Sequence, residues 1–224
     1  KAEEQFGVPK EIIAAITGVE TRYGLHKGTY RVLDALVTLG FDYPPRAKFF
    51  RSELKHALLL AKEQGFDINK MKGSYAGAMG YGQFISSSYR HYAIDFDGDK
   101  VADILDNPID AIGSVANYFS MHHWEKGAAV AFLLPENQID DDVEKYTSKN
   151  LKPSFAIGEM RKSGLVIPKA LISEDLAKIQ SFQLENGEQN WLTLHNFYVI
   201  TRYNHSHLYA MAVFELAKEL GLPE

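Results

Sequence analysis

A glutamate stands in an otherwise apolar stretch, AAITGVETRYG, at residues 14–24. The neighbouring apolar residues recur at helical spacing and predict an amphipathic helix that begins at Pro9; they are Ile12, Ile16, Val19 and Tyr23. Glu20 then lies on or beside the apolar face. One interpretation is a solvated glutamate near a helix end that Gly24 closes. The other is a half-buried acid with a raised pKa, which could donate a proton near neutral pH.

A second candidate is the acidic segment DFDGDKVADILD at residues 95–106, whose acids fall at positions 1, 3, 5, 9 and 12 of a twelve-residue loop. This spacing directs oxygen ligands at one calcium ion in an EF-hand loop. The expected ligands are Asp95, Asp97, Asp99, the carbonyl of Val101, Asp103 and Asp106, with Asp110 as a further closing carboxylate. Lys100 occupies position 6, where glycine is usual. We expect Ca²⁺ or Na⁺ in a structural role, and an acidic solvated loop is the alternative.

Two further segments combine aromatic rings with amide and hydroxyl groups, which can hold sugars by stacking and neutral hydrogen bonds. The first, residues 73–89, has four glycines that allow a ligand close to the backbone. The second is residues 196–210. We expect Gln83, Phe84, Tyr203 and Asn204 to bind sugar rather than to form the core. A structural Gly/Tyr loop is the alternative for the first segment.

Composition limits the classes of function. The net charge is −5 and no long Lys/Arg block occurs, so we expect no nucleic-acid partner. The sequence has no cysteine, which excludes disulfides and thiolate chemistry. No apolar run reaches the ~18–20 residues that span a bilayer. The chain begins without Met, so we expect a fragment whose export signal or anchor could lie upstream.

The elements that must position these residues are mainly helical in the first half. Periodicity predicts helices over residues 47–64 and from Pro108 onward, with Asn107 as an N-cap. Residues 73–89 predict a loop that leads into a short helix. In the second half, residues 128–135 predict a strand and residues 136–170 a polar insert. Alternation around ENG predicts a hairpin within residues 177–203, and a helix closes the chain.

Four segments, GVETRYG, AGAMGYGQFISSSY, DAIGSVANYF and NFYVITRYNHS, occur in an order that resembles the membrane-bound lytic murein transglycosylase B family. The resemblance implies an α+β, predominantly α-helical fold, with a lysozyme-like core, an EF-hand-like loop and a small C-terminal β-hairpin region. We expect a catalytic core at residues 1–130, an insert or small mixed subdomain at 131–190, and a C-terminal segment at 191–224 that completes the cleft.

The resemblance also implies the roles of particular residues. Glu20 matches the catalytic acid/base of the family, which needs no cofactor for catalysis. The sugar-binding positions fall on Arg46, Ser74, Met79, Gln83, Phe84, Tyr118, Tyr203, Asn204 and Tyr209. The segment YPPRAKFF departs from the family, because Pro45 replaces an arginine and Phe49 a tyrosine.

The implied reaction is cleavage of the β-1,4 bond between MurNAc and GlcNAc in peptidoglycan. Ordinary glycosidases pair two carboxylates, yet the segments GVETRYG, AGAMGYGQF and VITRYNHS contain one acid between them, Glu20. One acid suffices if the C6 hydroxyl of MurNAc attacks C1 and leaves a 1,6-anhydro end. A lysozyme-type hydrolase and a non-catalytic glycan-binding module remain the alternatives.

The implied location is the periplasm, or the periplasmic face of the outer membrane, of a Gram-negative bacterium. Peptidoglycan glycan strands are the expected partner. The resemblance further allows outer-membrane anchoring through an upstream segment and contacts with cell-wall synthesis proteins.

Overall fold

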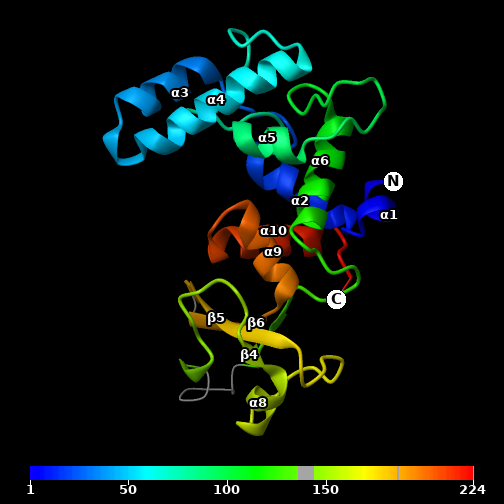
Figure 1. The fold of residues 1–224 in the computed structure, drawn as a ribbon. Coiled ribbons are helices and arrows are strands. Elements are labelled where there is room, and N and C mark those ends of the chain that lie inside the picture. The colour runs from blue at the N-terminus through cyan, green and yellow to red at the C-terminus, as the bar shows by residue number, and fades with distance from the viewer. Residues whose placement is uncertain (136–143, 186, 224) are drawn as a thin grey trace. The chain divides into compact units, whose positions relative to one another are not determined.

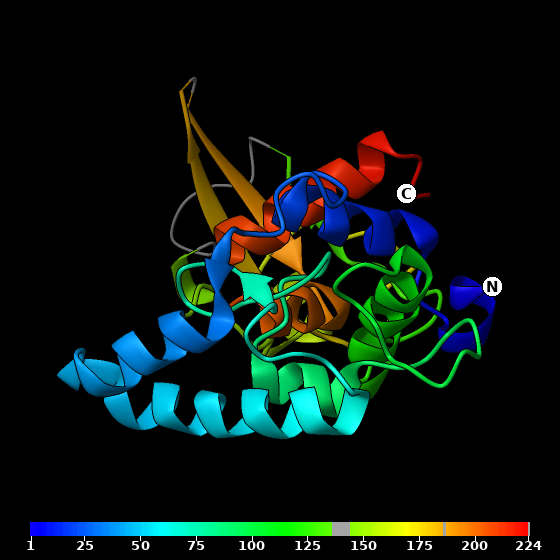
Figure 2. The ribbon, with the colours of Figure 1, turned by 90° about the horizontal axis from the view of Figure 1, so that it is seen from above.

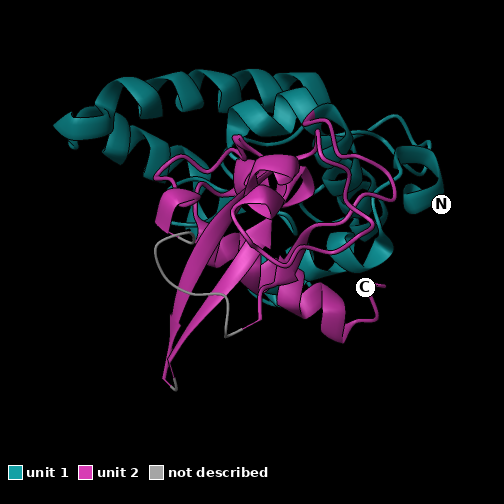
Figure 3. Ribbon diagram, turned by 90° about the horizontal axis from the view of Figure 1, so that it is seen from below, with its two compact units in different colours: residues 1–121 teal, residues 122–224 magenta. Residues whose placement is uncertain are grey.

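The computed structural model describes residues 1–135, 144–185 and 187–223, and it divides into two compact units. The first unit spans Lys1–Met121 and the second spans His122–Glu224 (Figure 3). From the sequence, boundaries are expected after residues 130 and 190. The structure instead groups residues 191–223 with the strands that precede them. Among the described residues, no helix is long and apolar enough to cross a membrane.

The first unit is mainly helical (Figure 1). Its elements are α1 (Ala2–Phe6), α2 (Lys10–Thr21), β1 (Tyr30–Arg31), α3 (Val32–Phe41), the 3₁₀ helix η1 (Pro44–Arg46), α4 (Ala47–Gln64), β2 (Lys72–Gly73), α5 (Ser86–Tyr92) and α6 (Pro108–Met121). Helices α3 and α4 lie side by side (Figures 1 and 2). The two short strands pair antiparallel, Tyr30 with Gly73 and Arg31 with Lys72.

Helix α2 begins where the sequence predicts but ends two residues early, at Thr21 rather than Tyr23. Ile12 and Ile16 are fully buried, whereas Val19 and Tyr23 are 37% and 54% exposed. The predicted apolar face is therefore correct for its first two members only. The helix ends at Thr21, because the chain enters the left-handed region at Arg22 (φ 50°).

Helices α4 and α6 match their predictions. The amphipathic helix α4 ends at Gly65, which adopts φ 74° and donates its amide to the Ala61 carbonyl, a common helix C-cap. Its buried face includes an acid, Glu53, whereas Leu58 is 49% exposed. Asn107 caps α6 as predicted, since its Oδ1 accepts from the Ile109 amide at 2.9 Å.

The second unit contains an antiparallel sheet in the order β3-β6-β5-β4. Its elements are β3 (Ala131–Leu133), β4 (Phe155–Ala156), α8 (Ile157–Lys162), β5 (Leu176–Leu184), β6 (Gly187–Thr193), α9 (His195–Tyr203) and α10 (His207–Glu219) (Figure 1). The predicted strand and hairpin are confirmed, with Leu184 opposite Gly187. The predicted turn residue Asn186 lies outside the described residues, as do residues 136–143 of the predicted insert.

Residues 195–203 differ from the prediction. The alternating pattern is expected to continue through NFYVITRY, but the structure forms helix α9 there. The Asn196 side chain fixes the start of this helix. Its Nδ2 donates to the carbonyls of Glu125 and Ala128, and its Oδ1 accepts from the Glu125 amide. A tertiary contact therefore overrides the strand preference of Val199 and Ile200.

One core cluster of the second unit includes residues of β5, β6 and α8. Its buried side chains are Leu134, Tyr146, Ile157, Met160, Leu165, Ile167, Ala177, Ile179, Leu192 and Leu194. Among the described residues of this unit, one buried side chain is charged. Lys178, 2% exposed, donates to the carbonyls of Ser148 and Asn150 at 2.7 and 2.9 Å and to Gln180 Oε1 at 3.2 Å. Burial lowers the pKa of this ammonium group.

Candidate active site

Glu20 is half-buried in the last turn of α2. The residue after it, Thr21, is 1% exposed and connects this turn to the glycine-rich loop. The Thr21 hydroxyl accepts from the Gly24 amide at 2.9 Å and lies 3.0 Å from the Tyr81 carbonyl and 3.1 Å from the Thr17 carbonyl. One hydroxyl group thus fixes the backbone on both sides of the turn that carries Glu20.

The backbone after Glu20 is tightly wound. Arg22 and Tyr23 adopt φ values of 50° and 57°, which are uncommon for residues with a side chain. Gly24 follows at φ 89°, and a Cβ there would meet the Tyr81 ring at 2.2 Å. Glycine is therefore required at position 24, both by the conformation and by the close approach of the loop.

Two more contacts hold the glycine-rich loop against this turn. A Cβ at Gly28 would lie 2.1 Å from the backbone of Gly73, so the backbone segments around these two glycines are in direct contact. Gln83, at φ 50°, donates its Nε2 to the carbonyls of Lys27 (3.2 Å) and Gly80 (2.9 Å). The amide oxygen of Gln83 is consequently the group that this side chain can offer to a sugar.

The loop also has an internal frame. The Ser74 hydroxyl accepts from the amides of Ala76 and Ala78 at 3.2 and 3.1 Å. Met79 forms backbone bridges to Gly73 and Phe84. Ser74 and Met79 therefore order the loop, whatever contact they make with a ligand.

Three predicted sugar-binding residues are buried. Met79, Phe84 and Tyr118 are 0%, 3% and 7% exposed, and the rings of Phe84 and Tyr118 pack with centroids 5.8 Å apart. The expectation that Phe84 lies outside the core is therefore wrong. Its ring packs against the ring of Tyr118, and this packing attaches the glycine-rich loop to helix α6.

The acidic loop gathers four carboxylates. Asp95, Asp97, Asp99 and Asp110 each place a carboxylate oxygen within 4.8 Å of the others, a spacing that could hold a metal ion. Hard carboxylate oxygens suit Ca²⁺. Asp110 is fully buried and accepts from the Phe96 and Asp103 amides at 2.7 and 2.8 Å. Backbone amides of Gly98 and Lys100 lower the pKa of Asp95, so its carboxylate stays ionised.

The other predicted ligands have different contacts. The closing Asp106 forms an ion pair with Lys27 at 2.8 Å and is not among the clustered carboxylates. Asp103 caps a turn, accepting from the Leu105 and Asp106 amides. The alternative closing residue, Asp110, joins the cluster instead. The Val101 amide donates to Asp99 Oδ1 at 2.8 Å.

The acidic loop is attached to the glycine-rich loop through Ile104. The Tyr81 amide donates to the Ile104 carbonyl at 3.2 Å, and a Cβ at Gly80 would meet that oxygen at 2.2 Å. Lys27 donates to the Leu105 carbonyl at 2.6 Å and lies 4.7 Å from the centre of the Tyr81 ring. The end of the acidic loop therefore supports the backbone that faces the Glu20 turn.

Arg46 lies apart from these contacts. It is exposed at the end of η1, and its guanidinium stacks on the rings of Phe49 and Phe50 at 4.4 and 5.1 Å. Phe49, one of the departures from the family pattern, thus packs against Arg46.

The remaining predicted sugar residues belong to the second unit. Tyr203 ends α9 and its ring stacks on Tyr209, with planes 6° apart and centroids 6.5 Å apart. Asn204 follows α9 and is exposed. Ser206 caps α10 by accepting from the Tyr209 amide. Two half-buried tyrosines and an exposed amide thus form one cluster on this unit.

The residues that position the others were not predicted from the sequence. Thr21 was overlooked because a threonine at a helix end has no distinctive spacing. Lys27 was overlooked because its partners lie 78 and 79 residues away. Glu53, 4% exposed, accepts from the Ser87 amide at 2.8 Å and so fixes the start of α5. An acid at a buried position of the predicted helix 47–64 was the available signal.

Known proteins share this sequence and architecture. The transglycosylase SLT domain family model matches residues 1–218. Membrane-bound lytic murein transglycosylase B of Escherichia coli K12 is 46% identical over 99% of the chain, and the chain spans 60% of that protein's length.

Solved structures agree. Soluble lytic transglycosylase SltB1 of Pseudomonas aeruginosa is 50% identical and superposes with a TM-score of 0.91, covering 98% of this chain and 72% of its own. The E. coli lytic transglycosylase Slt35, in complex with calcium, is 46% identical with a TM-score of 0.87, covering 97% of this chain and 67% of its own. The chain described here therefore belongs to the transglycosylase SLT domain family.

Proposed function

We propose that this protein is a lytic transglycosylase that cleaves the β-1,4 bond between MurNAc and GlcNAc in peptidoglycan and leaves 1,6-anhydroMurNAc ends. The observation that supports this most is the position of Glu20. It is half-buried on a turn fixed by Thr21 against a glycine-rich loop. Family membership and the names of the relatives agree with this activity.

In this proposal Glu20 acts twice. Its protonated carboxyl first donates a proton to the glycosidic oxygen as the bond to C1 breaks. The resulting carboxylate then accepts the proton of the C6 hydroxyl while O6 bonds to C1, so Glu20 is regenerated. Residues 14–24, 73–89 and 196–210 contain no other acid. A second carboxylate is unnecessary, since the substrate supplies its own nucleophile.

Partial burial suits both steps. A carboxyl group with a pKa near the working pH is efficient in donating and in accepting a proton. Contact with apolar surroundings raises the pKa of a carboxyl group, because it disfavours the charged form. We therefore propose that Glu20 is protonated before substrate is cleaved.

We also propose how the glycan is held. The amide oxygen of Gln83 accepts from a sugar hydroxyl or N-acetyl N–H, while Tyr203, Asn204 and Tyr209 supply ring faces and an amide. Ser74, Met79, Phe84 and Tyr118 act mainly by fixing the loop. Arg46 contacts the glycan or its peptide as a guanidinium already ordered on Phe49 and Phe50.

For the acidic loop we propose a structural calcium site formed by Asp95, Asp97, Asp99 and Asp110. The clustered carboxylates fit this ion, and a relative's structure contains calcium. Through Ile104 the loop supports Gly80 and Tyr81. Sodium is the weaker candidate, because four carboxylates favour a divalent ion.

We propose that the protein acts in the periplasm or at the periplasmic face of the outer membrane, where its substrate lies. The E. coli relative is a membrane-bound murein transglycosylase. Anchoring through a further segment and contact with cell-wall synthesis proteins belong to the same proposal.

Digestion of purified peptidoglycan, followed by mass spectrometry of the muropeptides, tests this function. The proposal predicts products with 1,6-anhydroMurNAc ends. Reducing MurNAc ends would instead indicate a lysozyme-type hydrolase. Intact sacculi, with glycan bound but not cut, would indicate a binding module.

A further inference from the structure

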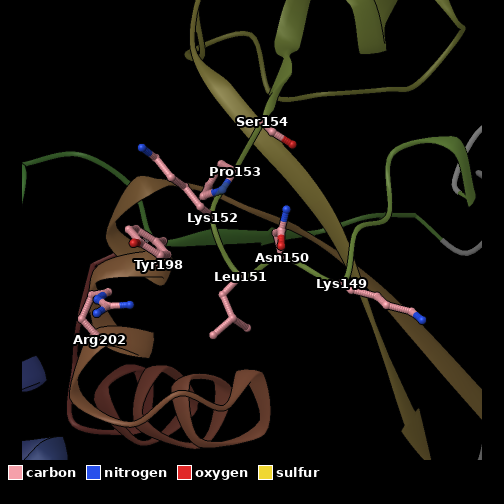
Figure 4. A pocket seen from close by; sticks show the side chains of 8 residues that line it. All are labelled: Lys149, Asn150, Leu151, Lys152, Pro153, Ser154, Tyr198 and Arg202. Atoms are coloured by element: carbon pink, nitrogen blue, oxygen red, sulfur yellow. The ribbon is translucent and has the colours of Figure 1, made fainter.

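The second unit has a cavity of about 430 Å³ between residues 149–154 and helix α9 (Figure 4). Its cationic side chains do not point toward one common position. The Lys152 ammonium points away from Arg202, and the Lys149 ammonium points away from both. Arg202 already interacts within the protein, including with the ring of Tyr198 at 5.8 Å. The lining of this cavity therefore selects no class of ligand.

In the first unit, Lys27 contacts the candidate active site through both its side chain and its main chain. Its ammonium group donates to the Leu105 carbonyl at 2.6 Å, pairs with Asp106 at 2.8 Å and lies 4.7 Å from the centre of the Tyr81 ring. Its carbonyl accepts from Nε2 of Gln83 at 3.2 Å. One residue thus connects the end of the acidic loop to the side chain proposed to hold a sugar.

The main chain at Lys27 depends on this side chain for its position. The two residues on either side of it are exposed, so this segment gains little from burial. Before it, the His26 amide donates to the Thr21 carbonyl at 2.9 Å, and after it Gly28 touches the backbone of Gly73. The ammonium contacts of Lys27 hold the residue that lies between these two points.

The Gln83 amide is oriented by two carbonyl groups. Its Nε2 carries two hydrogens and has two acceptors, the carbonyls of Lys27 at 3.2 Å and Gly80 at 2.9 Å. The reversed amide would bring its oxygen against both carbonyl oxygens, so this orientation is strongly favoured. Within the described part of the chain, Gln83 Oε1 itself accepts no hydrogen bond. It is therefore a preoriented acceptor for a donor group of a ligand.

We propose that Lys27 is a positioning residue for glycan binding. Its ammonium group fixes the Lys27 carbonyl, and this carbonyl fixes the Gln83 amide, whose oxygen accepts a hydrogen bond from the sugar. The inference rests on the proposed function, because it names the residue that orients a sugar-binding side chain of that site. Lys27 acts through Gln83 and needs no contact of its own with the sugar.

Binding of a chitooligosaccharide to the full chain, measured by NMR titration, tests this role. The probe is neutral, so the loss of a charge at position 27 does not by itself change its affinity. Lys27→Met keeps the apolar stem and should weaken binding about 3–10-fold, the scale of one hydrogen bond. Lys27→Arg should restore most of it, since a guanidinium can donate to the same oxygens. Lys70→Met, which removes an exposed lysine paired with Asp67, is the matched control and should bind normally.

A double-mutant cycle with Gln83→Ala shows whether Lys27 acts through Gln83. We expect Lys27→Met to weaken binding in the wild type but not in Gln83→Ala, because the amide that it positions is then absent. The Nε2 proton signals of Gln83, identified by their loss in Gln83→Ala, should also shift in Lys27→Met and not in Lys70→Met. A lysine that only stabilised the fold would give additive effects on binding.

Equal binding by Lys27→Met and the wild type, or additive effects in the cycle, would overturn the proposal, as would a wild type that does not bind the oligosaccharide. If Lys27→Met fails to fold, Lys27→Gln takes its place in the cycle. A wild type that forms 1,6-anhydroMurNAc ends but shows additive effects disproves this role alone. A wild type that shows the coupled effects but forms no such ends disproves the proposed function alone.

Discussion

Thr21 determines where Glu20 lies, although it carries no charge. Its hydroxyl is shared between the end of α2, the Gly24 amide and the Tyr81 carbonyl. Thr17, one turn earlier, donates only to carbonyls of its own helix, Ile13 and Ala14. Of these two threonine hydroxyls, the one of Thr21 contacts the glycine-rich loop and the one of Thr17 bonds within its own helix.

We predict that Thr21→Ala lowers cleavage of peptidoglycan at a temperature where the variant remains folded, because the Glu20 turn is released from the loop. Loss of its buried hydrogen bonds should reduce the free energy of unfolding by ~1–3 kcal/mol. Thr17→Ala serves as the control and should retain activity, and Thr21→Ser should restore it. Equal activity of the two alanine variants would contradict this positioning role.

Tyr203 was predicted to bind sugar, and its half-buried ring stacked on Tyr209 is compatible with that role. We predict that Tyr203→Ala weakens binding of chitooligosaccharides, measured by calorimetry, with little dependence on salt, since the contact is uncharged. Exposed His205→Ala is the control. A large loss of stability, ~3–5 kcal/mol as for a core aromatic, would show that Tyr203 belongs to the core instead.

The catalytic and metal-binding candidates could be named from sequence because each has a characteristic composition and spacing. The contacts that hold the Glu20 turn and the glycine-rich loop in place could not be predicted from the sequence, since Lys27 contacts Leu105 and Thr21 contacts Tyr81 only in the folded chain. The burial of aromatic residues was also hard to predict from the sequence. Aromatic and amide residues in a glycine-rich segment suggested a sugar-binding surface, but Phe84 is buried and packs against Tyr118.

Among the loops, the acidic segment allows a direct test of ligand identity. We predict that calcium raises the melting temperature of the wild type, by an amount equivalent to ~2.7 kcal/mol at 100 times Kd. Asp110→Asn should abolish most of this shift, because it removes a buried clustered carboxylate. Asp106→Asn should retain it, since Asp106 pairs with Lys27.

Calorimetric melting with calcium and with excess chelator measures both variants against the wild type. An identical calcium shift in Asp110→Asn and the wild type would exclude Asp110 as a ligand. An unchanged melting temperature of the wild type on addition of calcium would contradict the presence of a calcium site in this loop.

Helix α10 begins with His207, whose protonation is less favourable in the folded protein than in the unfolded chain. Burial, and then the charge of Lys178, lower the pKa of His207, whose ring packs 5.5 Å from that of Phe182. The unfolded chain, with a histidine pKa near ~6.5, therefore binds more protons than the folded protein between the two pKa values. The free energy of unfolding should consequently fall as pH drops through this window.

We predict that His207→Gln loses less stability than the wild type between pH values of about 7.5 and 5. Urea denaturation at several pH values measures the difference. Exposed His205→Gln should follow the wild type. A parallel pH profile for His207→Gln and the wild type would show that His207 does not contribute.

Helix periods, caps and the hairpin were readable in the sequence because they depend on neighbours within a few residues. The helix at 195–203 was not, because Asn196 is fixed by a turn some 70 residues earlier. The same cause explains the domain boundary. Pairing of Ala131 with Thr193 joins the start of the predicted insert to the predicted C-terminal segment in one sheet, and this pairing leaves no periodic signal.

The whole chain combines a helical unit that carries Glu20 and the acidic loop with a second unit that carries a sheet, two helices and a tyrosine pair. We propose that one glutamate of this chain moves both protons and that water takes no part in the reaction.

Digestion of peptidoglycan in H₂¹⁸O, with mass spectrometry of the products, tests that claim most directly. We predict that the wild type forms 1,6-anhydroMurNAc ends without ¹⁸O, and that Glu20→Gln, folded as judged by circular dichroism, is slower by ~10²–10⁴-fold. Reducing ends labelled with ¹⁸O, or near-normal turnover by Glu20→Gln, would contradict it.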